Sequence, residues 1–209
     1  MKILKTALLC LFLAPHTLVA QEHDVYASSA GSRVDVFEHE DLNYRLDLAA
    51  EAYTFIDFSE QVPEASFAAI RFKPNAFSLV VVEDLGVGVS AEQYAEVVQI
   101  AMEDQLSGDD DSEFKGYEDI GMLEERGMDV FQKKVYATVR SKPFTYVIST
   151  YVDGPRAYQL LTFASGEPDE AVVEQADLLL NAFSVIDSEK NQHVVVESSG
   201  VKDYRSTTF

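Results

Sequence analysis

The sequence predicts an α+β domain in which a single antiparallel meander sheet of about six strands is covered by two main helices. Three long strand patterns, at 129–140, 144–152 and 156–164, follow one another with links of only three residues. Consecutive strands joined by such short links must be antiparallel. Two segments with apolar residues at helical spacing, 91–105 and 168–183, lie outside this run of strands. Strands and helices that are segregated along the chain are typical of the α+β class.

The domain begins with two short strand patterns, at 34–37 and 43–48. The second of them alternates apolar and charged residues, which is typical of a half-buried strand. Two stronger strand patterns follow at 67–72 and 77–83. The short link between them contains Pro74, a turn residue, so we expect these two strands to form a hairpin.

A capping box predicts where the first helix begins. The Ser90 hydroxyl and the Gln93 amide stand three residues apart and would satisfy the first free backbone groups of the helix. The helix is then expected to bury one stripe, which consists of Tyr94, Val97, Val98, Ala101 and Met102. After it comes an acidic run, 109–113, and a strand is expected at 120–125.

The acidic run 109–113 offers the oxygen ligands that calcium prefers. A helix–loop–helix calcium site, however, alternates its acids and carries a glycine at the sixth position, and this run does neither. We interpret it as a solvated loop, with calcium binding as the alternative. The final helix, 168–183, is expected to bury Val172, Ala176, Leu179, Leu180 and Phe183.

The amino-terminal residues have the pattern of a cleavable secretory signal. Lys2 and Lys5 precede an apolar run, and a polar segment follows Ala20. The apolar run is too short to span a bilayer, which takes roughly 20 residues. We therefore expect residues 1–20 to be removed and the mature protein to be periplasmic or secreted. Cys10, the one cysteine, leaves with the signal, so no disulfide holds the fold.

The predicted signal divides the chain into four parts. The signal peptide 1–20 is followed by a polar leader at 21–33, the folded domain at 34–187 and a polar tail at 188–209. Two interpretations of this tail stay open, since its last residues match the apolar positions of the first strand loosely. It is either a simple tail or the start of a truncated second repeat.

The charge of the chain excludes two classes of partner. With 16 basic and 36 acidic residues the formal net charge is −20. A surface of this charge repels phosphate backbones and anionic headgroups, so we expect neither nucleic-acid binding nor membrane insertion after signal removal. We expect a monomer that binds an envelope protein.

The residues that could act in catalysis or bind a metal are too dispersed in the sequence to indicate a catalytic or metal site. His23, His39 and His193 of the mature chain lie in the leader, an early turn and the tail. Nucleophilic catalysis needs a base beside a nucleophile, and zinc needs clustered ligands. A pair of catalytic carboxylates cannot be identified from the sequence, because the chain has 36 acidic residues. We therefore predict no catalytic residue, no metal and no cofactor, and a protein that is not an enzyme.

Aromatic residues concentrate on the three long strands. Because side chains alternate along a strand, Tyr146 and Tyr151 are expected on opposite faces of the sheet. These faces are either core with ordinary cross-strand pairs or a partly exposed docking surface. The candidate residues for contact with a ligand or partner are Tyr136, Tyr146, Tyr151 and Tyr158.

Several packing motifs resemble the PsbP-like fold family over about residues 34–187. They are the hairpin before the Ser90 helix and two segments that read Gly154-Pro155-Arg156-Ala157-Tyr158-Gln159-Leu160 and Leu179-Leu180-Asn181-Ala182-Phe183-Ser184-Val185. The resemblance implies an exported accessory role. It carries over no histidine metal-ligand pattern, and the chain has no tryptophan.

The leading hypothesis is thus a non-catalytic accessory or protein-binding domain of the bacterial cell envelope. The alternatives are a carrier of a small apolar ligand and a hydrolase that uses acidic residues.

Overall fold

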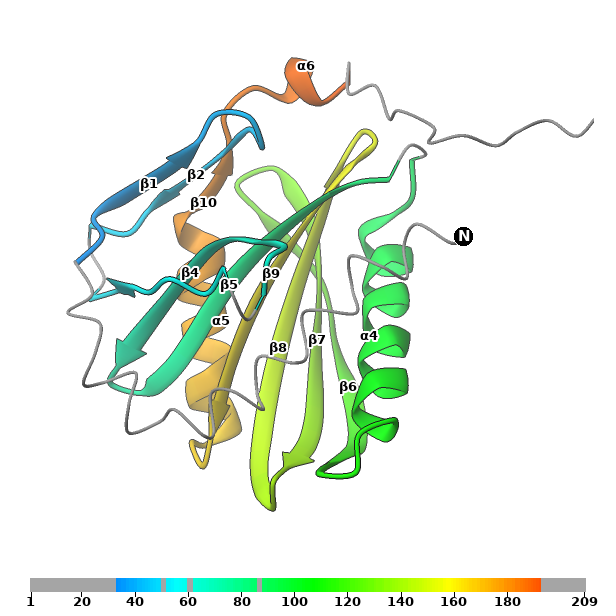
Figure 1. The fold of residues 1–209 in the computed structure, drawn as a ribbon. Coiled ribbons are helices and arrows are strands. Elements are labelled where there is room, and N and C mark those ends of the chain that lie inside the picture. Colours follow the sequence, from blue (N-terminus) through cyan, green and yellow to red (C-terminus); the bar gives the residue numbers. More distant parts are fainter. Residues whose placement is uncertain (1–32, 50–51, 60–61, 86–87, 193–209) are drawn as a thin grey trace, which may run out of the picture.

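The computed structural model describes residues 33–49, 52–59, 62–85 and 88–192 (Figure 1). The predicted signal peptide 1–20, almost all of the predicted leader 21–33 and the chain from 193 onward lie outside the described residues. Within the described part, no helix has the length and apolar character needed to cross a membrane.

The described residues contain a seven-stranded antiparallel sheet in the order β3-β4-β5-β9-β8-β7-β6. Its strands are β3 (Thr54–Phe55), β4 (Ala65–Phe72), β5 (Asn75–Asp84), β6 (Ser112–Glu125), β7 (Met128–Val139), β8 (Lys142–Asp153) and β9 (Arg156–Ser165). The predicted hairpin is confirmed as β4-β5, and the three predicted long strands are confirmed as β7, β8 and β9.

The sheet differs from the prediction in two details. The strand expected at 120–125 begins earlier, at Ser112, so the end of the acidic run 109–113 is strand rather than loop. The short amino-terminal strands do not join the main sheet. They form a second sheet, in the order β1-β2-β10, from β1 (Val36–His39), β2 (Tyr44–Asp47) and β10 (Phe183–Val185). The pairing of β10 with β2 joins segments that are far apart in sequence, so no local sequence pattern indicates it.

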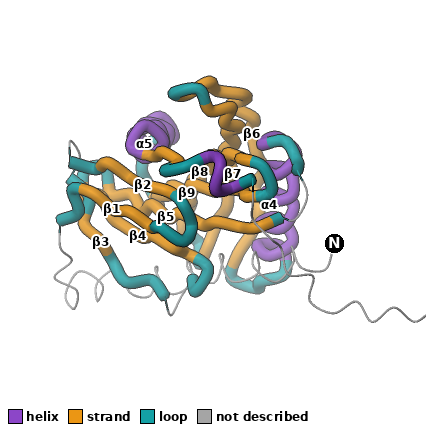
Figure 2. Tube along the Cα trace, turned by 90° about the horizontal axis from the view of Figure 1, so that it is seen from above, coloured by secondary structure: helices purple, strands orange, loops and turns teal. Residues whose placement is uncertain are grey.

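Two long helices cover opposite faces of the main sheet (Figures 1 and 2). The helix α4 (Ala91–Ser107) packs on β6, β7 and β8, and its predicted capping box is confirmed. The helix α5 (Asp169–Ala182) packs mainly on β8 and β9. It ends one residue before Phe183, which instead begins β10. A short helix, α6 (Ser188–Asn191), follows.

The core therefore has two layers, one on each face of the main sheet. The α4 layer contains Tyr94, Val98 and Met102 of the predicted helix stripe, whereas Val97 of that stripe is exposed. The α5 layer joins that helix to the second sheet through Leu179, which is fully buried. The α+β class with helices that cover an antiparallel sheet is confirmed.

Candidate functional site

The structure separates the four candidate tyrosines. Tyr146 and Tyr151 lie on opposite faces of the sheet, as expected, but Tyr146 belongs to the α4 layer of the core and is 1% exposed. Tyr158 is buried in the α5 layer, where Tyr151 stacks against it with ring centroids 6.0 Å apart. Tyr146 and Tyr158 therefore present no surface to a partner: Tyr146 is packed in the α4 layer, and Tyr158 is covered by Tyr44 of β2 and Phe183 of β10. Tyr136 and Tyr151 are partly exposed.

Tyr136 lies in a groove between α5 and the β6-β7 edge of the sheet, which we call the acidic groove. Its volume is about 650 Å³. Glu118, Asp119, Ile120, Lys134, Tyr136, Asp169, Glu170, Val173, Glu174 and Asp177 line it. The groove exists because α5 covers β8 and β9 and leaves the adjoining surface of β7 and β6 uncovered. In Figure 2, α5 and β6 are seen beside each other at this edge.

Strand alternation sets the floor of the acidic groove. On β7, Gln132, Lys134 and Tyr136 point toward the α5 side, while Val135 between them belongs to the α4 layer of the core. Strand alternation therefore places Gln132 and Lys134 on the same face of the sheet. It does not show that this face meets the flank of a helix.

The acids on the groove floor are neutralised by lysines of β7. The ammonium of Lys134 lies 2.7 Å from the Glu118 carboxylate, and the Tyr136 hydroxyl donates to the same carboxylate at 3.1 Å. The hydrogen bond from Lys134 lowers the pKa of Glu118 below its usual value. The ammonium of Lys133 lies 2.7 Å from Asp119. These two carboxylates thus add little net charge to the groove.

The wall of the acidic groove is different, because its charge is not balanced by nearby cations. It consists of four carboxylates of α5, namely Asp169, Glu170, Glu174 and Asp177. Among the described residues, none of these four forms an ion pair. Asp169 accepts a hydrogen bond from the Thr145 hydroxyl at 2.7 Å, and Asp177 accepts one from the Gln132 amide at 3.1 Å. The wall therefore presents a net negative surface to whatever enters the groove.

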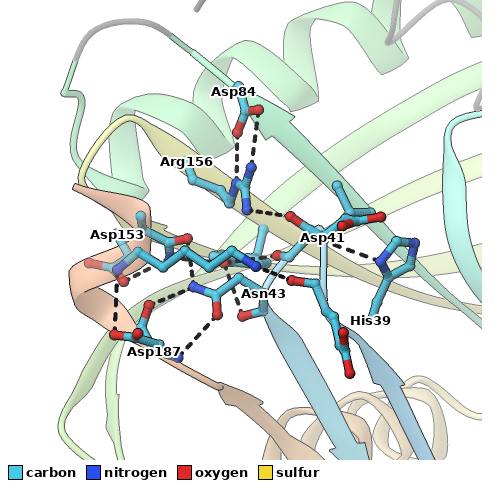
Figure 3. Close-up of polar contacts among 12 residues, drawn as sticks. His39, Asp41, Asn43, Asp84, Asp153, Arg156 and Asp187 are labelled. Atoms are coloured by element: carbon cyan, nitrogen blue, oxygen red, sulfur yellow. Dashed lines mark hydrogen bonds and ion pairs between the residues drawn. The ribbon is translucent and has the colours of Figure 1, made fainter. Parts of the chain in front are cut away.

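A second polar cluster, which we call the polar clasp, joins the turn before β2 to the β8-β9 hairpin and α6 (Figure 3). Its centre is Arg156, which is 6% exposed. The guanidinium donates two hydrogen bonds to the Asp84 carboxylate, at 2.7 and 3.2 Å, and a third to the carbonyl of Asp41. Such a bidentate pair is among the strongest polar contacts in proteins.

Two buried asparagines complete the polar clasp. The amide nitrogen of Asn43 donates to the carbonyl of Asp187 at 2.6 Å and to the side-chain oxygen of Asn191 at 2.8 Å. The Asn191 amide in turn donates to Asp153 and to the Tyr158 hydroxyl, both at 2.9 Å. Because these buried groups satisfy one another, we expect the polar clasp to stabilise the fold.

The polar clasp involves Tyr158, a predicted contact residue, and the domain boundary predicted at 187. Burial raises the pKa of Tyr158 to about 12, so its hydroxyl stays protonated and donates to the carbonyl of Leu42. The short helix α6 lies inside the predicted tail 188–209, yet Asn191 is fully buried. The folded part therefore extends at least to Gln192, beyond the expected boundary at 187.

No metal site is found in the part of the chain that the structure describes: it contains no group of three or more histidine, cysteine or acidic side chains that could hold an ion. His39 is the last residue of β1, and its Nδ1 accepts a hydrogen bond from the backbone N–H of Leu42 in the turn before β2. The acidic groove could not be predicted from the sequence. The chain contains 36 acidic residues, and only their positions in space distinguish the four on the wall.

One partly buried acid outside both clusters predicts a pH dependence of stability. Glu83 accepts a hydrogen bond from the Tyr94 hydroxyl at 2.6 Å. Burial raises the pKa of Glu83, the Tyr94 hydrogen bond lowers it, and nearby Glu64 raises it further, so that the pKa is raised on balance. Because the folded pKa exceeds the unfolded one, the contribution of Glu83 to stability is complete below the unfolded pKa and is lost as the pH rises through the folded pKa.

Glu83→Gln keeps an oxygen that can accept the Tyr94 hydrogen bond but cannot ionise. We expect it to raise the free energy of unfolding at about pH 7 and to change it much less at about pH 4. Urea denaturation at the two pH values measures this. The same substitution at Glu92, which is exposed on α4, is the control. An equal effect of Glu83→Gln at both pH values would contradict the assignment.

The comparisons with known proteins place the fold. No family model matches the sequence, and no curated protein matches it. Among solved structures, the chain is similar to cyanobacterial PsbP (CyanoP) from Synechocystis, with a TM-score of 0.53 and 12% identity. The match covers 76% of this chain and 98% of that chain.

Two further structures match with lower TM-scores. A protein of Bacteroides thetaiotaomicron matches with a TM-score of 0.47 and 9% identity. The match covers 74% of this chain and 49% of that chain. LpqN, described as involved in cell envelope biogenesis of Mycobacterium tuberculosis, matches with a TM-score of 0.42 and 14% identity. The match covers 76% of this chain and 87% of that chain. The expected PsbP-like fold is confirmed. At these identities the similarity establishes the fold alone.

Proposed function

We propose that this PsbP-like domain is an exported, non-catalytic binding domain of the bacterial cell envelope, and that the acidic groove is its contact surface for a partner protein. The observation that carries the proposal is the groove wall. The groove is concave, its α5 wall is negatively charged, and the aromatic ring of Tyr136 lies on its floor. Concave surfaces lined by one sign of charge concentrate the field and attract partners of the opposite sign.

The proposed site favours a polar partner over the other candidate functions. A carrier of apolar ligands needs a predominantly apolar pocket. The acidic groove is instead lined by carboxylates, with Ile120 and Val173 as its aliphatic members. The non-catalytic part of the proposal rests on the composition of the chain, in which the histidines are dispersed and the cysteine lies in the predicted signal.

Export predicts a specific amino terminus. When the full chain is expressed in a bacterium with its own first 20 residues, the mature protein is expected to begin at Gln21. Intact mass and terminal sequencing of the envelope fraction measure this. Recovery of the protein only in the cytoplasm, with Met1 retained, would contradict the export proposal.

Partner capture is expected to depend on the acidic groove. Glu170 and Glu174 are exposed, lie one turn apart on α5 and form no ion pair with a described residue. The double variant Glu170→Lys with Glu174→Lys should therefore fold normally. We expect it to lose most of the protein that wild type captures from the envelope fraction, because it reverses the charge of the wall.

The matched control for that experiment is Glu96→Lys with Asp104→Lys. Both residues are exposed on α4, on the opposite face of the sheet, and the net charge changes by the same amount. Capture that falls equally in both double variants would show that net charge and not the groove is responsible.

The non-catalytic part of the proposal is tested separately. The purified mature protein is assayed on ester, phosphate, peptide and glycoside substrates. Turnover that one acid or histidine substitution abolishes, with folding intact, would overturn the non-catalytic proposal.

A further inference from the structure

The wall of the acidic groove carries more negative charge than the stability of α5 explains. Asp169 and Glu170 lie in the first turn of the helix, where the macrodipole favours acids. Glu174 and Asp177 lie beyond that turn, so the dipole does not account for them. Four like charges along one flank repel one another unless a cation lies between them.

A buried amide beside the wall also lacks an expected partner. Gln132 is 1% exposed, and its Nε2 donates to Asp177 on the wall and to Ser149. Its Oε1 is shielded from solvent and accepts no hydrogen bond from a described residue. A buried acceptor without a donor is unfavourable. This amide holds Asp177 in place on the wall. The wall carboxylates are acceptors, so they match a ligand that supplies several N–H donors.

We infer that the acidic groove binds an arginine-containing basic segment of the partner protein. This inference rests on the proposed function, because it names the partner chemistry of the same groove. The guanidinium group supplies five N–H donors in a planar fork, which suits the carboxylates of the wall. The plane also stacks on an aromatic ring, and Tyr136 offers one on the groove floor.

The spacing of the wall fits an extended segment. Glu170 and Glu174 are four residues apart on α5, which places them about 6 Å apart along the helix axis. Alternate residues of an extended chain are about 6.6 Å apart. Asp169 and Asp177 lie about 12 Å apart on the same axis. A segment with arginines at alternate positions therefore brings successive guanidinium groups to successive carboxylates.

The binding experiment uses the mature protein and three labelled probes: hexa-arginine, hexalysine and hexaglutamate. Hexa-arginine is expected to bind more tightly than hexalysine, and hexaglutamate is expected not to bind. The variant Glu170→Lys with Glu174→Lys is expected to weaken hexa-arginine binding at least about tenfold, because two attractive pairs become repulsive. The control Glu96→Lys with Asp104→Lys is expected to weaken it by less than about twofold.

Tyr136 gives an independent readout. Tyr136→Phe keeps the ring and is expected to retain the preference for hexa-arginine over hexalysine, whereas Tyr136→Leu is expected to lose it. In NMR spectra, the side-chain amide of Gln132 is expected to shift when hexa-arginine is added, and the exposed amide of Asn181 is expected not to shift. Equal weakening by both double variants, or shifts confined to the α4 face, would overturn the inference.

The two proposals fail in different ways. If capture of the envelope partner depends on the groove while hexa-arginine does not bind there, the proposed function stands and the arginine inference is wrong. If neither the envelope partner nor hexa-arginine depends on the groove, both are wrong.

Discussion

Replacing Asn43 by alanine is expected to lower the free energy of unfolding by about 2 to 4 kcal/mol, because it removes a buried member of the polar clasp. Asn43 is 1% exposed, and its side chain makes three hydrogen bonds, to Asp187 and Asn191. The substitution leaves the buried oxygen of Asn191 without this donor. It also leaves alanine at a backbone φ of +60°, which is unfavourable for a residue with a Cβ.

Two further variants separate these causes. Asn43→Gly adopts the same φ without strain, so it is expected to cost about 1 kcal/mol less than alanine and to report the hydrogen bonds alone. Asn181→Ala changes an exposed asparagine on α5 and is expected to alter stability by less than about 0.5 kcal/mol. Urea denaturation followed by circular dichroism measures all three. If Asn43→Ala behaves like Asn181→Ala, the polar clasp does not stabilise the fold.

Leu179→Ala is expected to cost about 2 to 5 kcal/mol, the range for a leucine truncated in a packed core. Leu179 is fully buried where α5 meets both sheets, in the same apolar cluster as Leu46 of β2 and Leu160 of β9. The cavity left by alanine would therefore loosen the helix and the second sheet together.

The matched control for this prediction is the neighbouring residue. Leu178 is only partly buried on the same helix, so Leu178→Ala removes the same atoms from a less packed position. It is expected to cost clearly less than Leu179→Ala, at about 1 kcal/mol. Equal costs for the two variants, measured by the same denaturation, would show that α5 is not docked through Leu179.

Local patterns in the sequence were sufficient for most elements of the main sheet and for the two long helices. The capping box at Ser90 is confirmed because it depends on residues three positions apart. The hairpins of β4-β5 and β7-β8-β9 are confirmed because short links leave neighbouring strands no alternative to antiparallel pairing. The opposite orientation of Tyr146 and Tyr151 follows from the strand period alone.

The second sheet and the polar clasp could not be predicted in this way. The pairing of β10 with β2 joins Phe183 to Leu46, and the bond from Asn43 to Asn191 spans 148 positions of sequence. Neither contact has a local signature. Arg156 and Tyr158 belong to the segment that carries the fold resemblance, but the sequence does not show that they bind the turn before β2 and the helix α6.

The sequence by itself thus determined the α+β class, the antiparallel hairpins and the acidic character of this protein, because each depends on residue spacing or on composition. Only the tertiary structure decided which tyrosines are exposed and which acids face a groove. Burial depends on where a helix lies on the sheet: α4 covers Tyr146, and α5 stops short of Tyr136. Four carboxylates became a candidate site because α5 carries them along one flank, beside strands that it does not cover.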